Sequence, residues 1–327
     1  MGRERTTVLF IAGSGRSGST LLDNILGQVD GYFSAGELRY IWGRGILEKR
    51  LCGCGLRLLD CPVWHRILDD AFDGVDDSFA GEMLRRQNRN ARARRVPLML
   101  AARRHPARYM SRLGDYPENL ASLYRSIASV THARVVVDSS KLPAYGWLLD
   151  ALPSIDLRVV HLVRDPRAAA YSWMRKKVQP DRGRFGYMES QHPLKSAMLW
   201  DMWNSSAELF WRRSEGRYLR LRYEDLVRRP HDCLRSVLDL LGDATLELPF
   251  VDDRTVHLRP THTVAGNPNR LHAGQVVLKA DAGWVAGMPW PARAAVTAAT
   301  APLLLRYGYH PWQPGAGYAE PSNGQPR

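Results

Sequence analysis

The feature that most constrains the fold is an apolar segment near the N-terminus that runs directly into a glycine-rich turn. Residues 6–12 (TTVLFIA) are almost wholly apolar and partly β-branched, as in a strand buried on both faces of a parallel sheet. Residues 13–20 (GSGRSGST) break this run, and residues 21–28 resume with apolar spacing that suits a helix. Strand, glycine-rich turn and helix in this order predict the start of a βαβ unit.

Later segments continue the alternation of strands and helices. Further buried strands are predicted at residues 134–138, 157–163 and 218–223. Helices are predicted at residues 142–151, 166–177 and 230–241, the second with a proline in its first turn. The sequence therefore predicts an α/β fold with a P-loop-like, open, mostly parallel sheet that is flanked by helices.

The segment from about residue 43 to residue 131 departs from this alternation. It is rich in arginine and has few strand signals, so we expect a mainly helical insertion over the active edge of the sheet, on the acceptor side. Its basic stretch, Arg85 to Arg95, either contacts an acidic acceptor or an anionic lipid surface or is a solvated helix face. Residues 1–312 are predicted to form one domain, and residues 313–327, rich in proline and glycine, a disordered tail.

Net charge and the distribution of apolar residues indicate which partners and which location to expect. The 327 residues carry 46 Lys and Arg against 33 Asp and Glu, a net charge of +13 that favours anionic partners. Apolar runs fall short of the roughly 20 residues that a membrane span needs, and no signal peptide is recognised, so a cytoplasmic location is expected. No helix-turn-helix, RRM or zinc-finger pattern supports a basic nucleic-acid-binding protein, and no nucleic-acid partner is expected.

The glycine-rich turn predicts an anion site. It resembles the P-loop pattern G-x-x-x-x-G-K-[ST], but Ser19 stands where a kinase has its lysine. Backbone N–H groups, the following helix N-terminus and the hydroxyls of Ser17, Ser19 and Thr20 remain available to a phosphate. A P-loop kinase is the alternative enzyme, disfavoured by Ser19 and by the lack of a clear Mg²⁺-binding aspartate, for which Asp138 is the nearest candidate.

Two segments together resemble the sulfotransferases that use 3′-phosphoadenosine 5′-phosphosulfate (PAPS). Residues 16–20 (RSGST) are similar to an arginine-containing version of the family's 5′-phosphosulfate loop, which implies that Arg16, Ser17, Gly18, Ser19 and Thr20 bind the donor. Residues 163–172 (VRDPRAAAYS) are similar to its 3′-phosphate motif, which implies that Arg164 and Ser172 clasp the 3′-phosphate.

Further segments extend the resemblance toward the tyrosylprotein sulfotransferases and their bacterial relatives. Residues 221–227 (LRYEDLV) imply a nucleotide contact by Tyr223, and residues 262–270 (HTVAGNPNR) look like the loop that folds over the nucleotide, with Asn267 and Arg270 as candidates. Lys176 is a candidate for the 3′-phosphate or a surface cation.

The resemblance also implies the catalytic groups. A carboxylate in a Gly-Glu dipeptide about twenty residues after the loop's arginine is expected to be the base, and Glu37 holds that place; its alternative is a helix-terminal residue favoured by the dipole. Lys141 matches a catalytic lysine of the relatives, or is a solvated cap. Arg16 is expected to stabilise the departing phosphate.

Cys52, Cys54 and Cys61, with His65 nearby, leave three interpretations open: a zinc site, a local disulfide, or buried or free thiols. No metal is expected, because PAPS chemistry needs none. The Trp and Met side chains of residues 198–203 are expected in the core. The sequence thus predicts sulfuryl transfer from PAPS, with PAP as the product, to an acceptor hydroxyl of a small molecule, glycan or lipid.

Overall fold

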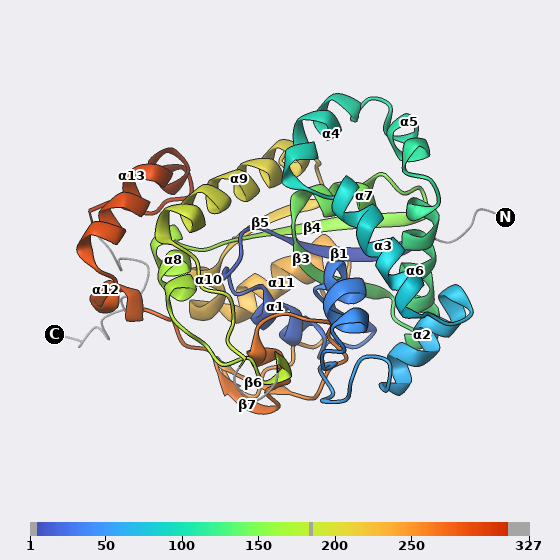
Figure 1. Cartoon of the computed structure of the whole chain (residues 1–327). Helices are drawn as coiled ribbons and strands as arrows, with labels where there is room; N and C mark the ends of the chain where they lie inside the picture. The colour runs from blue at the N-terminus through green and yellow to red at the C-terminus, as the bar shows by residue number, and fades with distance from the viewer. Residues whose placement is uncertain (1–4, 183–185, 313–327) are drawn as a thin grey trace.

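The computed structural model describes residues 5–182 and 186–312; the predicted tail lies outside the described residues. Five parallel strands form one sheet in the order β2-β3-β1-β4-β5. They are β1 (Thr6–Ala12), β2 (Tyr32–Gly36), β3 (Val135–Lys141), β4 (Ile155–Val163) and β5 (Tyr218–Arg222). The open parallel sheet flanked by helices is confirmed (Figure 1).

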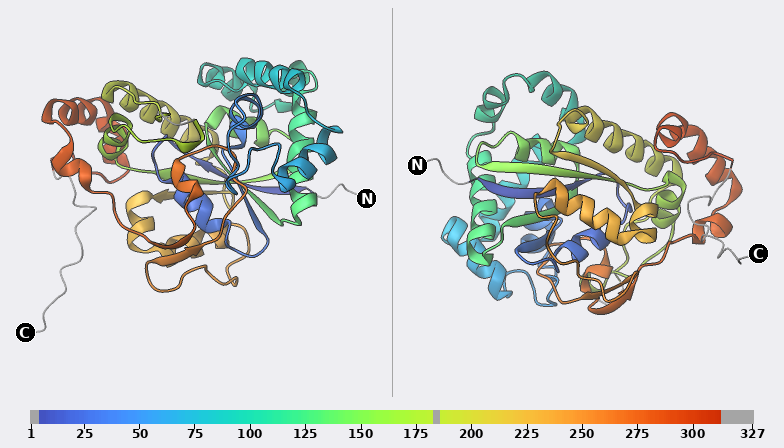
Figure 2. Two further views of the ribbon diagram at one scale, coloured as in Figure 1. Left: turned by 60° about the horizontal axis from the view of Figure 1, so that its bottom comes forward. Right: turned by 180° about the vertical axis from the view of Figure 1, so that it is seen from behind.

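Alternation along β1 divides the interior into two main cores. Val8, Phe10 and Ala12 point into one core and Leu9 and Ile11 into the other, because successive strand side chains face opposite sides of a sheet. The first core contains residues of α2 (Pro62–Phe72), α3 (Asp77–Asn90), α4 (Val96–Ala102), α5 (Pro106–Met110), α6 (Tyr116–Thr131), α7 (Pro143–Asp150) and α9 (Pro193–Trp211). The second contains residues of α1 (Ser19–Leu26), α10 (Tyr223–Arg228) and α11 (Pro230–Leu240). Figure 2 shows helices on both faces.

A π-helix (Ile41–Leu47) follows β2 after a short 3₁₀ turn (Leu38–Tyr40), and further helices and strands lie outside the central sheet. They are α8 (Pro166–Met174), α12 (Gly283–Gly287), α13 (Trp290–Arg306) and an antiparallel pair formed by β6 (Thr255–Leu258) and β7 (Gly274–Val277). No helix within the described ranges is long and apolar enough to cross a membrane.

The arginine-rich segment forms several helices, and most of it packs on one face of the sheet. Its helices α2 and α6 pack on each other and contribute to the core on one face of the sheet. Their apolar residues, among them Trp64 and Leu120, are fully or almost fully buried there. Most of the insertion therefore covers a face of the sheet, because the hydrophobic area is on that face, whereas Arg44 near its start lies beside Glu37 at the active edge. A role of the insertion on the acceptor side stays a prediction.

One strand was missed, and two local predictions were wrong. The edge strand β2 was not predicted, since its sequence YFSAG is short and ends in small residues. Helix α8 ends at Met174, so Lys176 lies beyond it rather than on its face. Trp200 is buried, whereas Met198 is 70% exposed and Met202 37%, because only one side of α9 packs on the molecule.

Candidate active site

The carboxyl ends of all five parallel strands supply residues to one cavity. The loop after β1 contributes Arg16, Glu37 follows β2, Lys141 ends β3, Arg164 follows β4 and Tyr223 follows β5. All five side chains line a cavity of about 620 Å³. In open parallel sheets this edge is where ligands bind, because the loops there converge at a change in strand order.

The turn after β1 requires glycine at defined positions. Gly18 has φ +92°, and a Cβ at that position would lie 2.4 Å from the ring of Tyr223. Gly13 has φ +135°, and a Cβ there would lie 2.4 Å from the carbonyl oxygen of Leu162. Only glycine avoids both the backbone strain and these contacts, so the turn packs tightly against β4 and the start of α10.

Several hydrogen-bonding atoms of this turn are buried without a protein partner in the described part of the chain. They are Nε and Nη2 of Arg16 and the hydroxyls of Ser14 and Ser17. Buried polar groups normally find partners, and here they flank the N-terminus of α1, where the helix dipole favours an anion. The turn therefore fits a phosphate or sulfate group. Ser17 is fully buried and, unlike Arg16, Gly18, Ser19 and Thr20, does not line the cavity.

Arg16 is held in a position from which it can meet such an anion. Its guanidinium stacks on Trp173, with 4.4 Å between its central carbon and the ring centroid. Burial lowers its pKa to about 10, which leaves it charged at neutral pH. Arg16 and Lys141 both have positive φ, +66° and +68°. Such conformations are costly for residues with a side chain and concentrate at functional sites.

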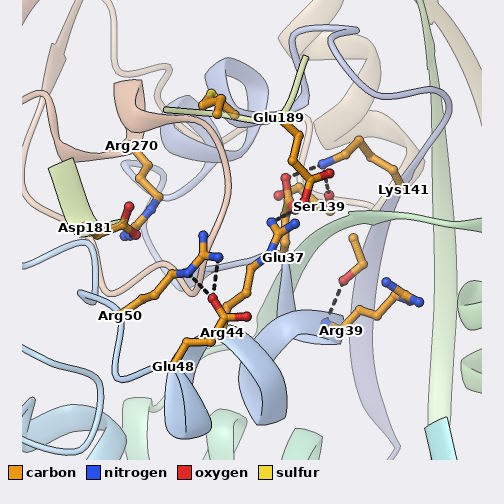
Figure 3. Close-up of polar contacts among 12 residues, drawn as sticks. Glu37, Arg39, Arg44, Glu48, Arg50, Ser139, Lys141, Asp181, Glu189 and Arg270 are labelled. Atoms are coloured by element: carbon orange, nitrogen blue, oxygen red, sulfur yellow. Dashed lines mark hydrogen bonds and ion pairs between the residues drawn. The ribbon is translucent and has the colours of Figure 1, made fainter. Parts of the chain in front are cut away.

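Glu37 and Lys141 form a buried ion pair in the wall of the cavity. The Nζ of Lys141 lies 2.5 Å from Oε1 of Glu37 and donates a second hydrogen bond, 2.9 Å long, to the carbonyl of Ser139 (Figure 3). The guanidinium of Arg44 approaches the other carboxylate oxygen to 4.0 Å. The carboxylate thus has a cation on each side.

These cations decide the charge of Glu37. Burial alone would raise its pKa, but the charges of Lys141 and Arg44, with a smaller contribution from Arg16, outweigh burial and hold the pKa below its ordinary value. Glu37 is therefore ionised at neutral pH and can accept a proton. Glu37 also precedes a helical stretch, a 3₁₀ turn (Leu38–Tyr40) that continues directly into a π-helix (Ile41–Leu47), but its side chain makes no capping hydrogen bond there.

Arg164 joins the turn to a second part of the site. It donates to the carbonyl of Arg16 at 3.1 Å and to the carboxylate of Asp281 at 3.2 Å, and its guanidinium lies over the ring of Tyr223. Arg175 also donates to Asp281, at 3.0 Å. Ser172 lies two turns into α8 and lines the same cavity.

The loop after α8 contributes a further group of polar side chains to the wall of the cavity. Lys176 and Lys177 both line it, and Nζ of Lys177 donates to Asn267 at 2.9 Å and to Asn269 at 2.6 Å. Burial and the neighbouring arginines Arg16 and Arg175 lower the pKa of Lys177. Asn267, predicted from the sequence, is thus in the wall.

Arg270 has a different position from the one the resemblance implies. It does not line the cavity. Its guanidinium is almost fully buried and donates to Asp181 at 2.9 Å and to the carbonyls of Leu51 and Thr263. These partners use its donors, so in this structure Arg270 connects loops and does not face the cavity.

The basic stretch from Arg85 to Arg95 is also separate from the cavity. Arg85 and Arg86 pair with Glu82 on the same helix, and Arg86 also with Asp115. Of the insertion, only Arg44 and Arg50 line the cavity. A contact of Arg85–Arg95 with an acidic acceptor or a lipid surface stays a prediction.

Sequence reasoning missed several residues of the wall, because their positions depend on how loops and short helices pack together rather than on a local pattern. They are Arg44, Arg50, Trp173, Arg175, Lys177 and Asp281. A signal existed for Lys177, since the adjacent pair Lys176-Lys177 holds two of the six lysines of the chain.

The fold and the residues at the carboxyl edge of the sheet define an α/β protein with an anion-binding turn that resembles a P-loop. Comparison with known proteins gives the family. Residues 9–245 match the sequence profile of the sulfotransferase family, and the chain belongs to that family.

Individual relatives are distant. The human protein carbohydrate sulfotransferase 3 is 29% identical over 176 residues, which are 48% of this chain and 34% of the human protein. The chain thus matches about a third of the length of this curated relative.

Two solved structures share the fold. The sulfotransferase domain of the Synechococcus PCC 7002 olefin synthase has a TM-score of 0.53 and 21% identity, with 94% of this chain and 96% of that one covered. The sulfotransferase domain of the curacin biosynthetic pathway has a TM-score of 0.51 and 17% identity, with 94% and 99% covered.

Proposed function

We propose that the chain is a sulfotransferase that moves a sulfuryl group from PAPS to an acceptor hydroxyl. One observation carries the proposal: the strand ends bring an anion-binding turn and an ionised, buried carboxylate into the same cavity. The turn accounts for binding of the donor, and the carboxylate accounts for activation of the acceptor. Membership of the sulfotransferase family supports the same reaction.

The donor nucleotide has two sets of residues available. Arg16, Gly18, Ser19 and Thr20, which line the cavity, and the N-terminus of α1 would hold the 5′-phosphosulfate. Arg164 and Ser172 would hold the 3′-phosphate, with Lys176 or Lys177 as a further cation. Tyr223, whose ring lies between Gly18 and Arg164, would support the nucleotide between these two sets.

Glu37 would act as the base. In the transfer, the acceptor oxygen forms a bond to sulfur, the bond between sulfur and the phosphate oxygen breaks, and the acceptor's proton passes to Glu37. PAP leaves with the negative charge that Arg16 and Lys141 would stabilise. Lys141 also holds the Glu37 carboxylate in place by the 2.5 Å contact, which suits a reaction whose main requirement is positioning.

The acceptor is proposed as a small molecule, glycan or lipid with a hydroxyl group. Arg44 and Arg50 line the cavity near Glu37 (Figure 3), and Arg182 also lines it. These cations favour an acceptor with negative charge. The name of the human relative, a carbohydrate sulfotransferase, supports a glycan among these classes. A cytoplasmic location stays a prediction of the sequence.

The kinase alternative has less support. Asp138, the nearest candidate for a Mg²⁺ ligand, does not line the cavity. Its carboxylate instead accepts hydrogen bonds from Tyr124 and from Ser140. Together with Ser19 in the lysine position, this leaves the phosphate site without the metal-binding half of a kinase.

Calorimetric titration with PAP beside ADP, both without Mg²⁺, tests the donor assignment. PAP and ADP differ in where their phosphates are attached, and only PAP offers a 3′-phosphate to Arg164 and Ser172. We expect PAP to bind at least about 10-fold more tightly, the effect of one charge-assisted hydrogen bond. Equal affinity, or no binding of either nucleotide, would remove the PAPS assignment. Sulfate transfer from labelled PAPS to a panel of hydroxyl acceptors then identifies the acceptor class.

A further inference from the structure

Three cysteines and one histidine meet beside the active site. The Sγ atoms of Cys52, Cys54 and Cys61 and a ring nitrogen of His262 all lie within 4.8 Å of one another. All three cysteines are free thiols. We propose that this Cys/His cluster binds a single Zn²⁺ ion, although the sequence alone led us to expect no metal.

The spacing of the ligand atoms fits one tetrahedral ion. Zinc bonds of about 2.3 Å to sulfur and about 2.0 Å to nitrogen place two sulfurs about 3.8 Å apart and sulfur and nitrogen about 3.5 Å apart. In the structure Nδ1 of His262 lies 3.3 Å from Sγ of Cys61 and 3.8 Å from Sγ of Cys52. Three thiolates and an imidazole are ligands that favour zinc over magnesium or calcium.

Neither a hydrogen bond nor a disulfide accounts for the whole cluster. A thiol–imidazole hydrogen bond explains one contact of His262, but not the meeting of three thiols at the same ring. A disulfide joins two sulfurs at about 2.05 Å and leaves the third thiol and the histidine without a role. A metal ion uses all four groups at once.

The local backbone brings two distant segments together at this point. The turn with Cys52 and Cys54 pairs with the segment after His262: Cys52 bridges to Val264, and the N–H of Gly53 donates to the carbonyl of Thr263 at 3.0 Å. A Cβ at Gly53 would lie 2.6 Å from the oxygens of Thr261 and Thr263, so the close approach requires glycine.

Helix α2 supplies the third cysteine and holds the histidine. Cys61 is the residue before its first turn, and the indole of Trp64 donates to the carbonyl of His262 at 2.6 Å. The histidine nearest in sequence, His65, is exposed on this helix and is not in the cluster. The fourth ligand is therefore 201 residues from Cys61 along the chain, beyond the reach of a local motif.

The ion would have a structural role. Four protein ligands leave no open position for substrate or water. Val264, two residues after His262, donates to the carbonyl of Ala35 and accepts from the N–H of Glu37, both at 2.8 Å. Zinc would fix this segment and so position the backbone of Glu37, without a part in the transfer itself.

Elemental analysis of the full chain tests the proposal. Protein produced with zinc in the medium and purified without chelators should contain about one zinc per chain, as a four-ligand site requires. Cys61→Ser and His262→Ala should lose most of it. Cys233→Ser, at the one cysteine outside the cluster, and His65→Ala should retain it.

A measurement on the unmodified protein covers the case in which the variants fail to fold. A thiol-specific mercurial added to the native protein should release zinc, detected with a chelating dye, in step with the modification of three thiols. The proposal would be overturned if the purified protein contained no zinc, or contained iron instead. It would also be overturned if zinc persisted in both Cys61→Ser and His262→Ala. The PAP titration tests the proposed function, and the zinc content tests the Cys/His cluster. Either proposal can therefore fail without the other.

Discussion

The ammonium of Lys141 lies 2.5 Å from the carboxylate of Glu37, and both side chains are buried at the carboxyl edge of the sheet. A buried pair of this kind is costly to separate, because each charge would remain in a poorly solvated position. Glu37 follows β2 and Lys141 ends β3, two neighbouring strands whose segments are about a hundred residues apart in the chain.

Replacement of the carboxylate tests Glu37 as the base. Glu37→Gln keeps the size and a hydrogen-bond acceptor for Lys141 but cannot take a proton. We expect kcat to fall by about 10²- to 10⁴-fold, the range for loss of a general base, while PAP binds with unchanged affinity. Turnover near that of the wild type would exclude this role. Calorimetry with PAP on the same preparation controls for loss of fold.

Removal of the Lys141 charge should change the pH dependence of the reaction. Lys141 holds the pKa of Glu37 below its ordinary value, so Lys141→Met should raise that pKa. Because the reaction needs ionised Glu37, the acid limb of kcat/KM should move to higher pH. Lys141→Arg, which keeps the charge, should leave the limb near its wild-type position. If the acid limb of Lys141→Met stays at the wild-type pH, the ion pair does not control the pKa of Glu37. A lower activity without information on the limb does not decide this question.

The 3′-phosphate assignment predicts a selective effect at Arg164. Arg164→Ala should weaken PAP binding by about 10- to 100-fold, because a charge-assisted hydrogen bond to the phosphate is lost. The affinity for ADP, which has no 3′-phosphate, should change much less. Calorimetry with both nucleotides gives the comparison. Equal losses for PAP and ADP would mean that Arg164 supports the turn through its bond to Arg16 rather than binding the 3′-phosphate.

Asp281 should oppose nucleotide binding. Its carboxylate accepts hydrogen bonds from both Arg164 and Arg175, where a phosphate would place its own negative charge. Asp281→Asn keeps an oxygen acceptor but removes the charge, and the pair is partly exposed, so we expect PAP to bind about 2- to 10-fold more tightly. Weaker binding in the titration would show instead that the charge of Asp281 is needed to orient Arg164.

The residues of the site could be predicted where they follow a buried strand or belong to a family motif. Arg16, Lys141 and Arg164 stand at the ends of strands whose apolar runs mark them clearly. Glu37 was found by its Gly-Glu dipeptide although β2 itself was missed. Once β2 is known, the position of Glu37 follows from the same rule as the others, because parallel strands end at one edge.

Other features depend on contacts between segments far apart in sequence, which no local pattern contains. Arg270 was predicted to face the nucleotide, but Asp181 and two carbonyls use its donors. The cysteine pattern suggested His65, whereas the fold brings His262 to the thiols. In both cases the partner is set by how the 262–270 segment packs on the Cys52 turn.

The contact between Gly18 and Tyr223 predicts that the turn tolerates no side chain. Gly18→Ala would place a methyl group 2.4 Å from the ring at φ +92°, so either the ring or the turn must move. We expect a loss of about 1–3 kcal/mol in the free energy of unfolding, from overpacking and strain, and weaker PAP binding.

Gly242→Ala is the matched control, since Gly242 has φ +79° but nothing within 4 Å of its Cβ position. This variant should lose about 1 kcal/mol or less and bind PAP normally. Chemical denaturation and calorimetry on both variants separate the steric effect from backbone strain, and equal behaviour of the two would refute the packing of Tyr223 on the turn.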